Sequence, residues 1–68
     1  MIHVFKTSVK SEKQASMVGE FLNILLPYDS WNFDLEDKDR ILRVETIDLL
    51  PDTVVTILNS QGFECDEL

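Results

Sequence analysis

The residues that could do chemistry in this chain are few and scattered. Cys65 is the only thiol and His3 the only imidazole. A nucleophile and a base so far apart in the sequence do not by themselves form a catalytic pair. We expect Cys65 to act as a small buried hydrophobe on the last strand. The alternative is a weak metal site in which His3 and Cys65 are non-standard ligands.

A group of carboxylates is the other candidate for a cation site. Asp34, Glu36, Asp37 and Asp39 lie within six consecutive positions. A calcium loop of the EF-hand type needs a glycine at its sixth position, and none is present here. We therefore expect a solvated turn. Because the sequence also lacks a glycine-rich phosphate loop and a His-Glu-x-x-His motif, we expect no enzymatic activity and no cofactor.

Length and charge restrict the classes of partner. The 68 residues allow a single domain, residues 1–68, and the net charge is −7. An acidic chain without a basic stripe is repelled by nucleic acids and by anionic membranes, so we expect neither as a partner. One cysteine cannot form an intramolecular disulfide, and the N-terminus lacks the basic start and apolar run of a signal peptide. We expect a cytoplasmic protein.

The periodicity of apolar residues predicts two helices that follow strands. Val18, Phe21, Leu22 and Leu25 form one apolar stripe at helical spacing, which Pro27 ends. In the second helix Asp48 is a suitable N-cap, Pro51 suits the first turn, and Gly62 suits the left-handed position after the last turn. The expected strands are 2–9, 30–36, 40–47 and 63–68, and the expected helices are 11–26 and 48–60.

The first helix has its own start signal. Ser11 and Gln14 have the spacing of a capping box, in which each side chain binds a backbone N–H that the first turn leaves unpaired. Both residues are explained by this structural role. The other hypothesis is that they belong to a remodelled ligand or partner loop.

The element order is β-α-β-β-α-β, which is the ferredoxin-like arrangement of an α+β fold. Right-handed crossovers then predict an antiparallel sheet in the order 4-1-3-2, with both helices on one face. The first and last strands are neighbours in that sheet. His3 is therefore expected near the C-terminal end of the chain, close to Asp66 and Glu67.

Taken over nearly its whole length, the chain resembles a heavy-metal-associated domain, the copper-chaperone-like module of metal-transporting ATPases. In that family a Gly-Met-x-Cys-x-x-Cys loop follows the first strand. Val9 stands at the methionine position, and Ser11 and Gln14 stand where the two cysteines would be. Gly62-Phe63 matches the glycine-aromatic pair that closes the second helix. The resemblance implies a copper(I) site, but a hydroxyl and an amide cannot replace two soft thiolates. We expect no metal ion in this loop.

Aliphatic residues on the strands suggest an interface instead. If Phe5 faces the helices, its neighbours in the sequence face outward. A contiguous apolar patch of this kind often marks a binding surface. The expected interface, for a protein partner or a homodimer, comprises Ile2, Val4, Ile41, Arg43 and Ile47.

Three hypotheses about function follow from the sequence. The first is a non-enzymatic interaction module that has lost its thiolate metal site. The second is a metal-handling protein that uses Cys65 and His3. The third is a regulatory domain that binds a small molecule against its sheet.

Overall fold

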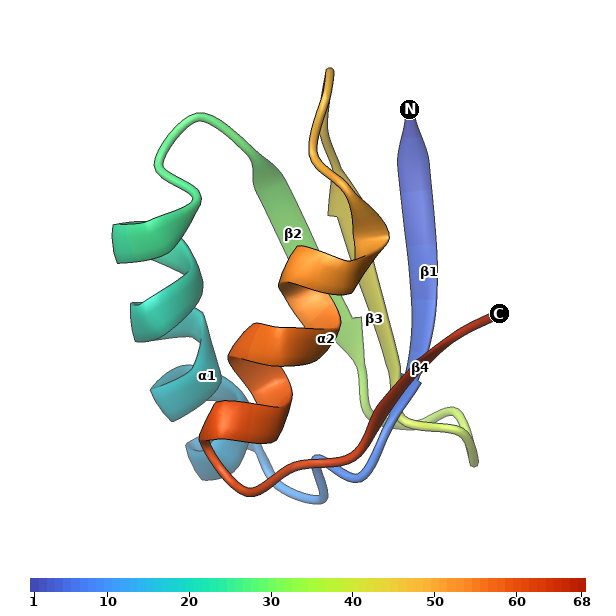
Figure 1. Cartoon of the computed structure of the whole chain (residues 1–68). Coiled ribbons are helices and arrows are strands. Elements are labelled where there is room, and N and C mark those ends of the chain that lie inside the picture. The colour runs from blue at the N-terminus through green and yellow to red at the C-terminus, as the bar shows by residue number, and fades with distance from the viewer.

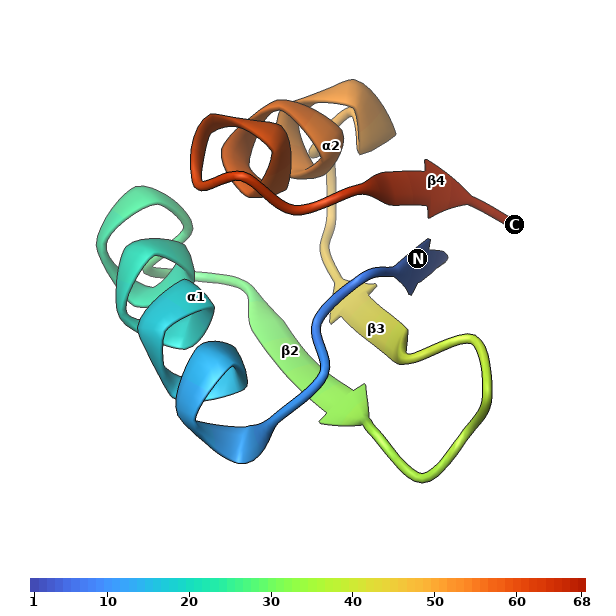
Figure 2. The same cartoon turned by 90° about the horizontal axis from the view of Figure 1, so that it is seen from below.

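A computed structural model describes all 68 residues. One sheet is formed by four antiparallel strands in the order β2 (Ser30–Asp34), β3 (Ile41–Glu45), β1 (Ile2–Thr7) and β4 (Cys65–Glu67), which reads 4-1-3-2 from the opposite edge. Both helices cover the same face of this sheet, and the other face is open (Figures 1 and 2). No helix is long and apolar enough to cross a membrane. The elements are β1 (Ile2–Thr7), α1 (Glu12–Leu25), β2 (Ser30–Asp34), β3 (Ile41–Glu45), α2 (Pro51–Ser60) and β4 (Cys65–Glu67).

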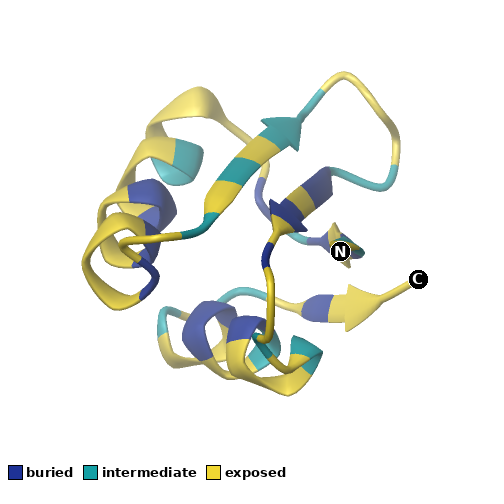
Figure 3. Cartoon of the chain, turned by 90° about the horizontal axis from the view of Figure 1, so that it is seen from above, coloured by how far each residue is buried: buried dark blue, intermediate teal, exposed yellow.

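The strand register decides which side chains face the helices. Phe5 of β1 is paired with Leu42 of β3, and Leu42 is paired in turn with Phe33 of β2. Side chains alternate between the two faces of a strand, so these three lie on the helix-covered face. Figure 3 shows the buried residues gathered between that face and the two helices. The largest fully buried side chains are Phe5, Leu22, Leu42, Leu58, Val9, Val18, Val44 and Val54.

Several element boundaries differ from the predicted ones. The strand β3 begins at Ile41 because Arg40 has a left-handed backbone, with φ of 50°, which a strand cannot continue. The strand β4 begins only at Cys65. The prediction that Asp48 caps α2 is wrong. The cap is Leu50, an extended residue (φ −79°, ψ 137°) without a side-chain hydrogen bond. Proline pushes the preceding residue out of the helical region, so the helix starts at Pro51.

The predicted ends of α1 and α2 agree more closely with the structure. Ser11 is the N-cap of α1, and Leu26 follows its last residue. Gly62 has φ of 87°, the left-handed conformation expected of a residue that ends a helix. The acidic connection between β2 and β3 is a turn, in which Asp37 accepts hydrogen bonds from Asp39 N–H (2.8 Å, to Oδ1) and Arg40 N–H (3.0 Å, to the carbonyl).

Candidate functional site

The loop before α1 is closed by its own hydrogen bonds. Ser11 Oγ accepts a hydrogen bond from the Gln14 N–H at 3.2 Å. In return Gln14 Oε1 accepts one from the Lys10 N–H at 2.8 Å. The capping box predicted a return bond to Ser11 itself, and the amide instead reaches one residue further back. The oxygens of both side chains are thus used by the backbone at the two positions that a metal loop would give to cysteines.

The same loop is tied to the segment that leads into β4. The Ser8 N–H donates to the Glu64 carbonyl at 3.1 Å. The Ser8 hydroxyl accepts from the Glu64 N–H at 2.8 Å. Thr7, which is buried, donates its hydroxyl to the Arg40 carbonyl at 2.6 Å. These bonds fix the end of β1 against two other segments, so the loop is an anchored part of the fold.

Cys65 belongs to the hydrophobic core. Its side chain is 4% exposed and packs in the cluster that contains Phe5 and Leu58. Burial raises the pKa of the thiol from 9.0 to about 12, and the neighbouring charge of Asp66 acts in the same direction. Metal binding and nucleophilic attack both require the thiolate. At neutral pH Cys65 is therefore protonated, a form that is a weak metal ligand and a weak nucleophile.

His3 lies close to the C-terminal strand, as the neighbouring positions of β1 and β4 predict. Its Nδ1 is 3.1 Å from Oε2 of Glu67, and its Nε2 is buried without a hydrogen-bond partner. The register places Thr7 opposite Cys65, so four positions, about 13 Å along β1, separate His3 from the residue that faces Cys65. The strands thus bring His3 to Glu67 but not to Cys65. No three His, Cys, Asp or Glu side chains lie together as a group that could hold a metal ion.

The open face of the sheet is less apolar than the sequence predicts. Ile2 is 61% exposed and Ile47 is 93% exposed, but Ile47 lies beyond the end of β3. Ile41 is only 6% exposed, so the prediction that it contributes to an interface is wrong. On the sheet it lies between its cross-strand neighbours Lys6 and Asp34.

The predicted interface residues do not join into one apolar patch, although Ile47 lines a small hollow together with the exposed Met1 and Tyr28. Val4 is half-buried, and the exposed Arg43 lies directly opposite it on β3. Arg43 is also 4.0 Å from the Asp34 carboxylate. Charged side chains thus interrupt the predicted interface, so the open face of the sheet carries no contiguous apolar patch formed by these residues.

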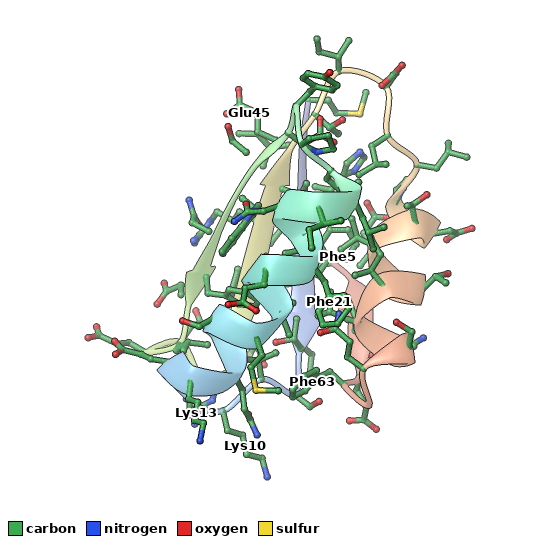
Figure 4. The ribbon with its side chains drawn as sticks, turned by 90° about the vertical axis from the view of Figure 1, so that its left-hand side faces the viewer. Phe5, Lys10, Lys13, Phe21, Glu45 and Phe63 are labelled. Atoms are coloured by element: carbon green, nitrogen blue, oxygen red, sulfur yellow. The ribbon has the colours of Figure 1, made fainter.

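A further exposed apolar surface lies on α1, where the sequence did not lead us to expect one. We name Met17, Phe21, Ile24 and Leu25 the outer stripe of α1. Their exposed fractions are 52%, 48%, 74% and 54%. Of the predicted apolar stripe, Val18 and Leu22 are buried, whereas Phe21 and Leu25 are exposed. Only part of the apolar surface of α1 is buried, and Figure 4 shows Phe21 on the side of α1 nearer α2. The signal was present in the sequence, because the four residues have the helical spacing i, i+4, i+7 and i+8.

A hollow of about 500 Å³ lies between the first half of α1 and the end of β2. Its apolar wall includes Trp31 and Phe33, whose ring centroids are 5.9 Å apart in an edge-to-face arrangement. Three carboxylates line it as well: Glu12, Asp34 and Glu36. The sequence predicts Asp34 and Glu36 in a solvated turn and does not indicate that Glu12 of α1 lies beside them.

Comparison with known proteins supports the fold but does not identify a family. Neither the family models nor the curated proteins compared with this chain match it. Among solved structures, the crystal structure of a protein named Gold binding protein is similar, with a TM-score of 0.84 and 22% sequence identity. The match covers 97% of this chain and 98% of that one. At this identity the likeness establishes a shared compact α+β fold.

Proposed function

We propose that the chain is a non-enzymatic protein-binding module of the cytoplasm that uses the outer stripe of α1. The observation that supports this role is the exposure of four large apolar side chains on one 14-residue helix. Exposed apolar residues that adjoin on one helix face favour a partner that also presents an apolar helix face.

The charge of the chain favours a basic partner. The net charge is −7, and the last turn of α1 carries no basic residue. Glu20, one turn before Ile24, and Asp29, just after the helix, add negative charge near the outer stripe. A second copy would bring two acidic surfaces together, whereas a basic amphipathic helix would meet complementary charge. We therefore assign the outer stripe to a basic amphipathic segment of another protein.

A titration with a designed peptide tests this proposal. A synthetic helix with leucines at positions i, i+4, i+7 and i+8 and lysines elsewhere should shift the amide NMR signals of α1 selectively. The double substitution Phe21→Ser/Ile24→Ser should weaken that binding at least tenfold. The matched control, Ile2→Ser/Ile47→Ser, removes exposed aliphatic residues from β1 and from the loop after β3 and should leave the binding unchanged. Equal binding by the same helix with glutamates in place of lysines would contradict the assignment.

We further propose that the module has the form of a heavy-metal-associated domain without its thiolate site. The element order, the Gly62-Phe63 pair and the position of Ser11 and Gln14 support this relationship. The hydrogen bonds of Ser11 and Gln14 to the backbone support the view that the loop is built to fold without metal.

Handling of a soft metal ion is the second candidate function, and the similarity to a protein named Gold binding protein favours it. Its ligands would be Cys65 and His3. The burial of Cys65 and its separation from His3 count against this candidate.

Native mass spectrometry with copper(I) and zinc(II), without oxygen, separates the two candidates. Wild type and Cys65→Ser should both remain free of metal. The variant Ser11→Cys/Gln14→Cys restores two thiols at the start of α1 and should take up one copper(I) ion. Stoichiometric metal in wild type that is lost in Cys65→Ser would establish the metal-handling candidate. If the two-cysteine variant took up no copper, this would contradict the proposal that Ser11 and Gln14 stand at the cysteine positions of a heavy-metal-associated domain.

A further inference from the structure

The hollow between α1 and β2 has the walls of a site for an organic cation. Trp31 and Phe33 provide two aromatic rings on one side of it, and Ala15 and Leu35 add apolar surface. Cations are attracted to the faces of aromatic rings, and tryptophan is the strongest partner of this kind. A volume of about 500 Å³ accommodates a large side chain with room for water.

Trp31 is held in place before any ligand arrives. Its indole Nε1–H donates to Asn23 Oδ1 of α1 at 3.0 Å. The far end of the indole lies against Gly19, where a Cβ atom would be only 2.4 Å from the ring carbon Cη2. The absence of a side chain at position 19 thus lets the ring pack against the helix. A ring fixed at both ends loses little conformational freedom on binding.

The charges in the hollow all have one sign. Glu12, Asp34 and Glu36 line it, and no lysine or arginine does. Asp34 is 4.0 Å from Arg43, while Glu12 and Glu36 form no ion pair. Lys10 and Lys13 project from the start of α1 away from the body of the domain (Figure 4). Two unpaired carboxylates therefore remain beside the aromatic wall.

We propose that this hollow receives an arginine side chain from the basic partner, and in this respect the inference rests on the proposed function. The guanidinium stacks on Trp31, and its N–H groups donate to the carboxylates of Glu12 and Glu36. Arginine fits better than lysine, because a planar and weakly hydrated cation both stacks on a ring and bonds carboxylates in a fork. A divalent metal ion fits poorly, because the carboxylates do not converge as a group of ligands.

Trp31 is the only tryptophan in the chain, so its fluorescence reports on this site directly. The peptide acetyl-Gly-Arg-Gly-amide should change the Trp31 emission in a saturable way, and the change should diminish with added salt. The same peptide with citrulline has nearly the same shape but no charge and should have no such effect. An equal effect of both peptides, or none from the arginine peptide at tens of millimolar, would overturn the proposal.

Charge-neutralising variants locate the binding. Glu12→Gln/Glu36→Gln should weaken binding of the arginine peptide by about five- to tenfold, as expected for the loss of two exposed ion pairs. The control Glu45→Gln/Glu64→Gln removes the same charge from exposed positions outside the hollow and should have less than a twofold effect. If both double variants weakened peptide binding equally, the peptide would be attracted by net charge alone. That result would overturn the proposal that the hollow is the binding site.

The outcome also separates this inference from the proposed function. If the amphipathic helix binds the outer stripe while the arginine peptide fails, only the hollow is assigned wrongly. If the arginine peptide binds and the amphipathic helix fails, the hollow is a cation site of its own, and its assignment to a partner of the outer stripe is overturned.

Discussion

Gly19 is the position in α1 where an added methyl group would collide with an aromatic ring. Alanine usually stabilises a helix by about 1 kcal/mol relative to glycine. Here the new Cβ would be 2.4 Å from Trp31, and overpacking of this kind costs about 1–3 kcal/mol. We expect Gly19→Ala to lower the free energy of unfolding by about 1 kcal/mol and to shift the Trp31 emission, as measured by urea denaturation.

A second background tests whether the ring causes the effect of Gly19→Ala. In Trp31→Phe the ring is shorter and the collision should disappear, so alanine at position 19 should then stabilise the chain. The two single variants and the double variant form a cycle whose coupling energy should exceed about 1 kcal/mol. A coupling energy near zero would mean that Trp31 does not pack on Gly19.

Cys65 makes stability depend on pH on the alkaline side. The pKa of the thiol is about 12 in the folded chain and near 9.0 in the unfolded one. Above pH 9 the unfolded chain releases a proton that the folded chain retains, so rising pH favours unfolding. The contribution is complete below pH 9 and decreases progressively between about pH 9 and 12.

Urea denaturation of wild type and Cys65→Ala at pH 7 to 10.5 measures this contribution. Alanine leaves a small cavity whose cost does not vary with pH, so the difference in the free energy of unfolding isolates the thiol. We expect wild type to lose stability faster than the variant above pH 9. Parallel curves would show that Cys65 is accessible to water.

At the scale of the element, the hydrogen bond from Gln14 N–H to the Ser11 hydroxyl starts α1. Replacing a serine N-cap by alanine typically costs about 1 kcal/mol. We expect Ser11→Ala to lower the free energy of unfolding by that amount in thermal or urea denaturation. Ser16→Ala, at an exposed position inside the same helix, should be neutral or slightly stabilising. Equal effects of the two variants would contradict the capping role.

Local signals in the sequence were sufficient for the helix starts and stops that depend on single residues. Ser11 and Gly62 behave as their residue types predict, because caps and left-handed positions are short-range geometry. The start of α2 was misplaced, since two short-range signals, Asp48 and Pro51, compete there and proline restricts the residue before it. The left-handed conformation of Arg40 had no such signal.

The outer stripe and the hollow depend on distances that a sequence does not contain. Spacing shows that Phe21 and Leu25 share a helix face with core residues, but it does not show how much of α1 the sheet covers. In the same way, Glu12 and Glu36 become neighbours only when α1 packs beside the end of β2. The separation of His3 from Cys65 follows from the register of β1 and β4. This register cannot be inferred from the residue types at positions 3 and 65.

At the scale of the whole molecule, net charge and exposed apolar surface act against each other. The charge of −7 at neutral pH keeps copies of the chain apart, although the outer stripe offers a surface on which they could associate. Near the isoelectric point, about pH 4.3, this repulsion vanishes. We therefore expect a monomer at pH 7 and self-association through the outer stripe near pH 4.3, as measured by sedimentation velocity.

The variants that test partner binding also test this balance of charge and apolar surface. Phe21→Ser/Ile24→Ser should suppress the association near pH 4.3, because it removes two of the four apolar side chains of the outer stripe. Ile2→Ser/Ile47→Ser removes two exposed aliphatic side chains from β1 and from the loop after β3 and should not suppress the association. Circular dichroism at the same pH must show folded chains in each case, since unfolded chains associate through other segments. If association persists equally in both variants, then loss of charge alone drives self-association. The outer stripe would then not be the surface through which copies of this domain associate.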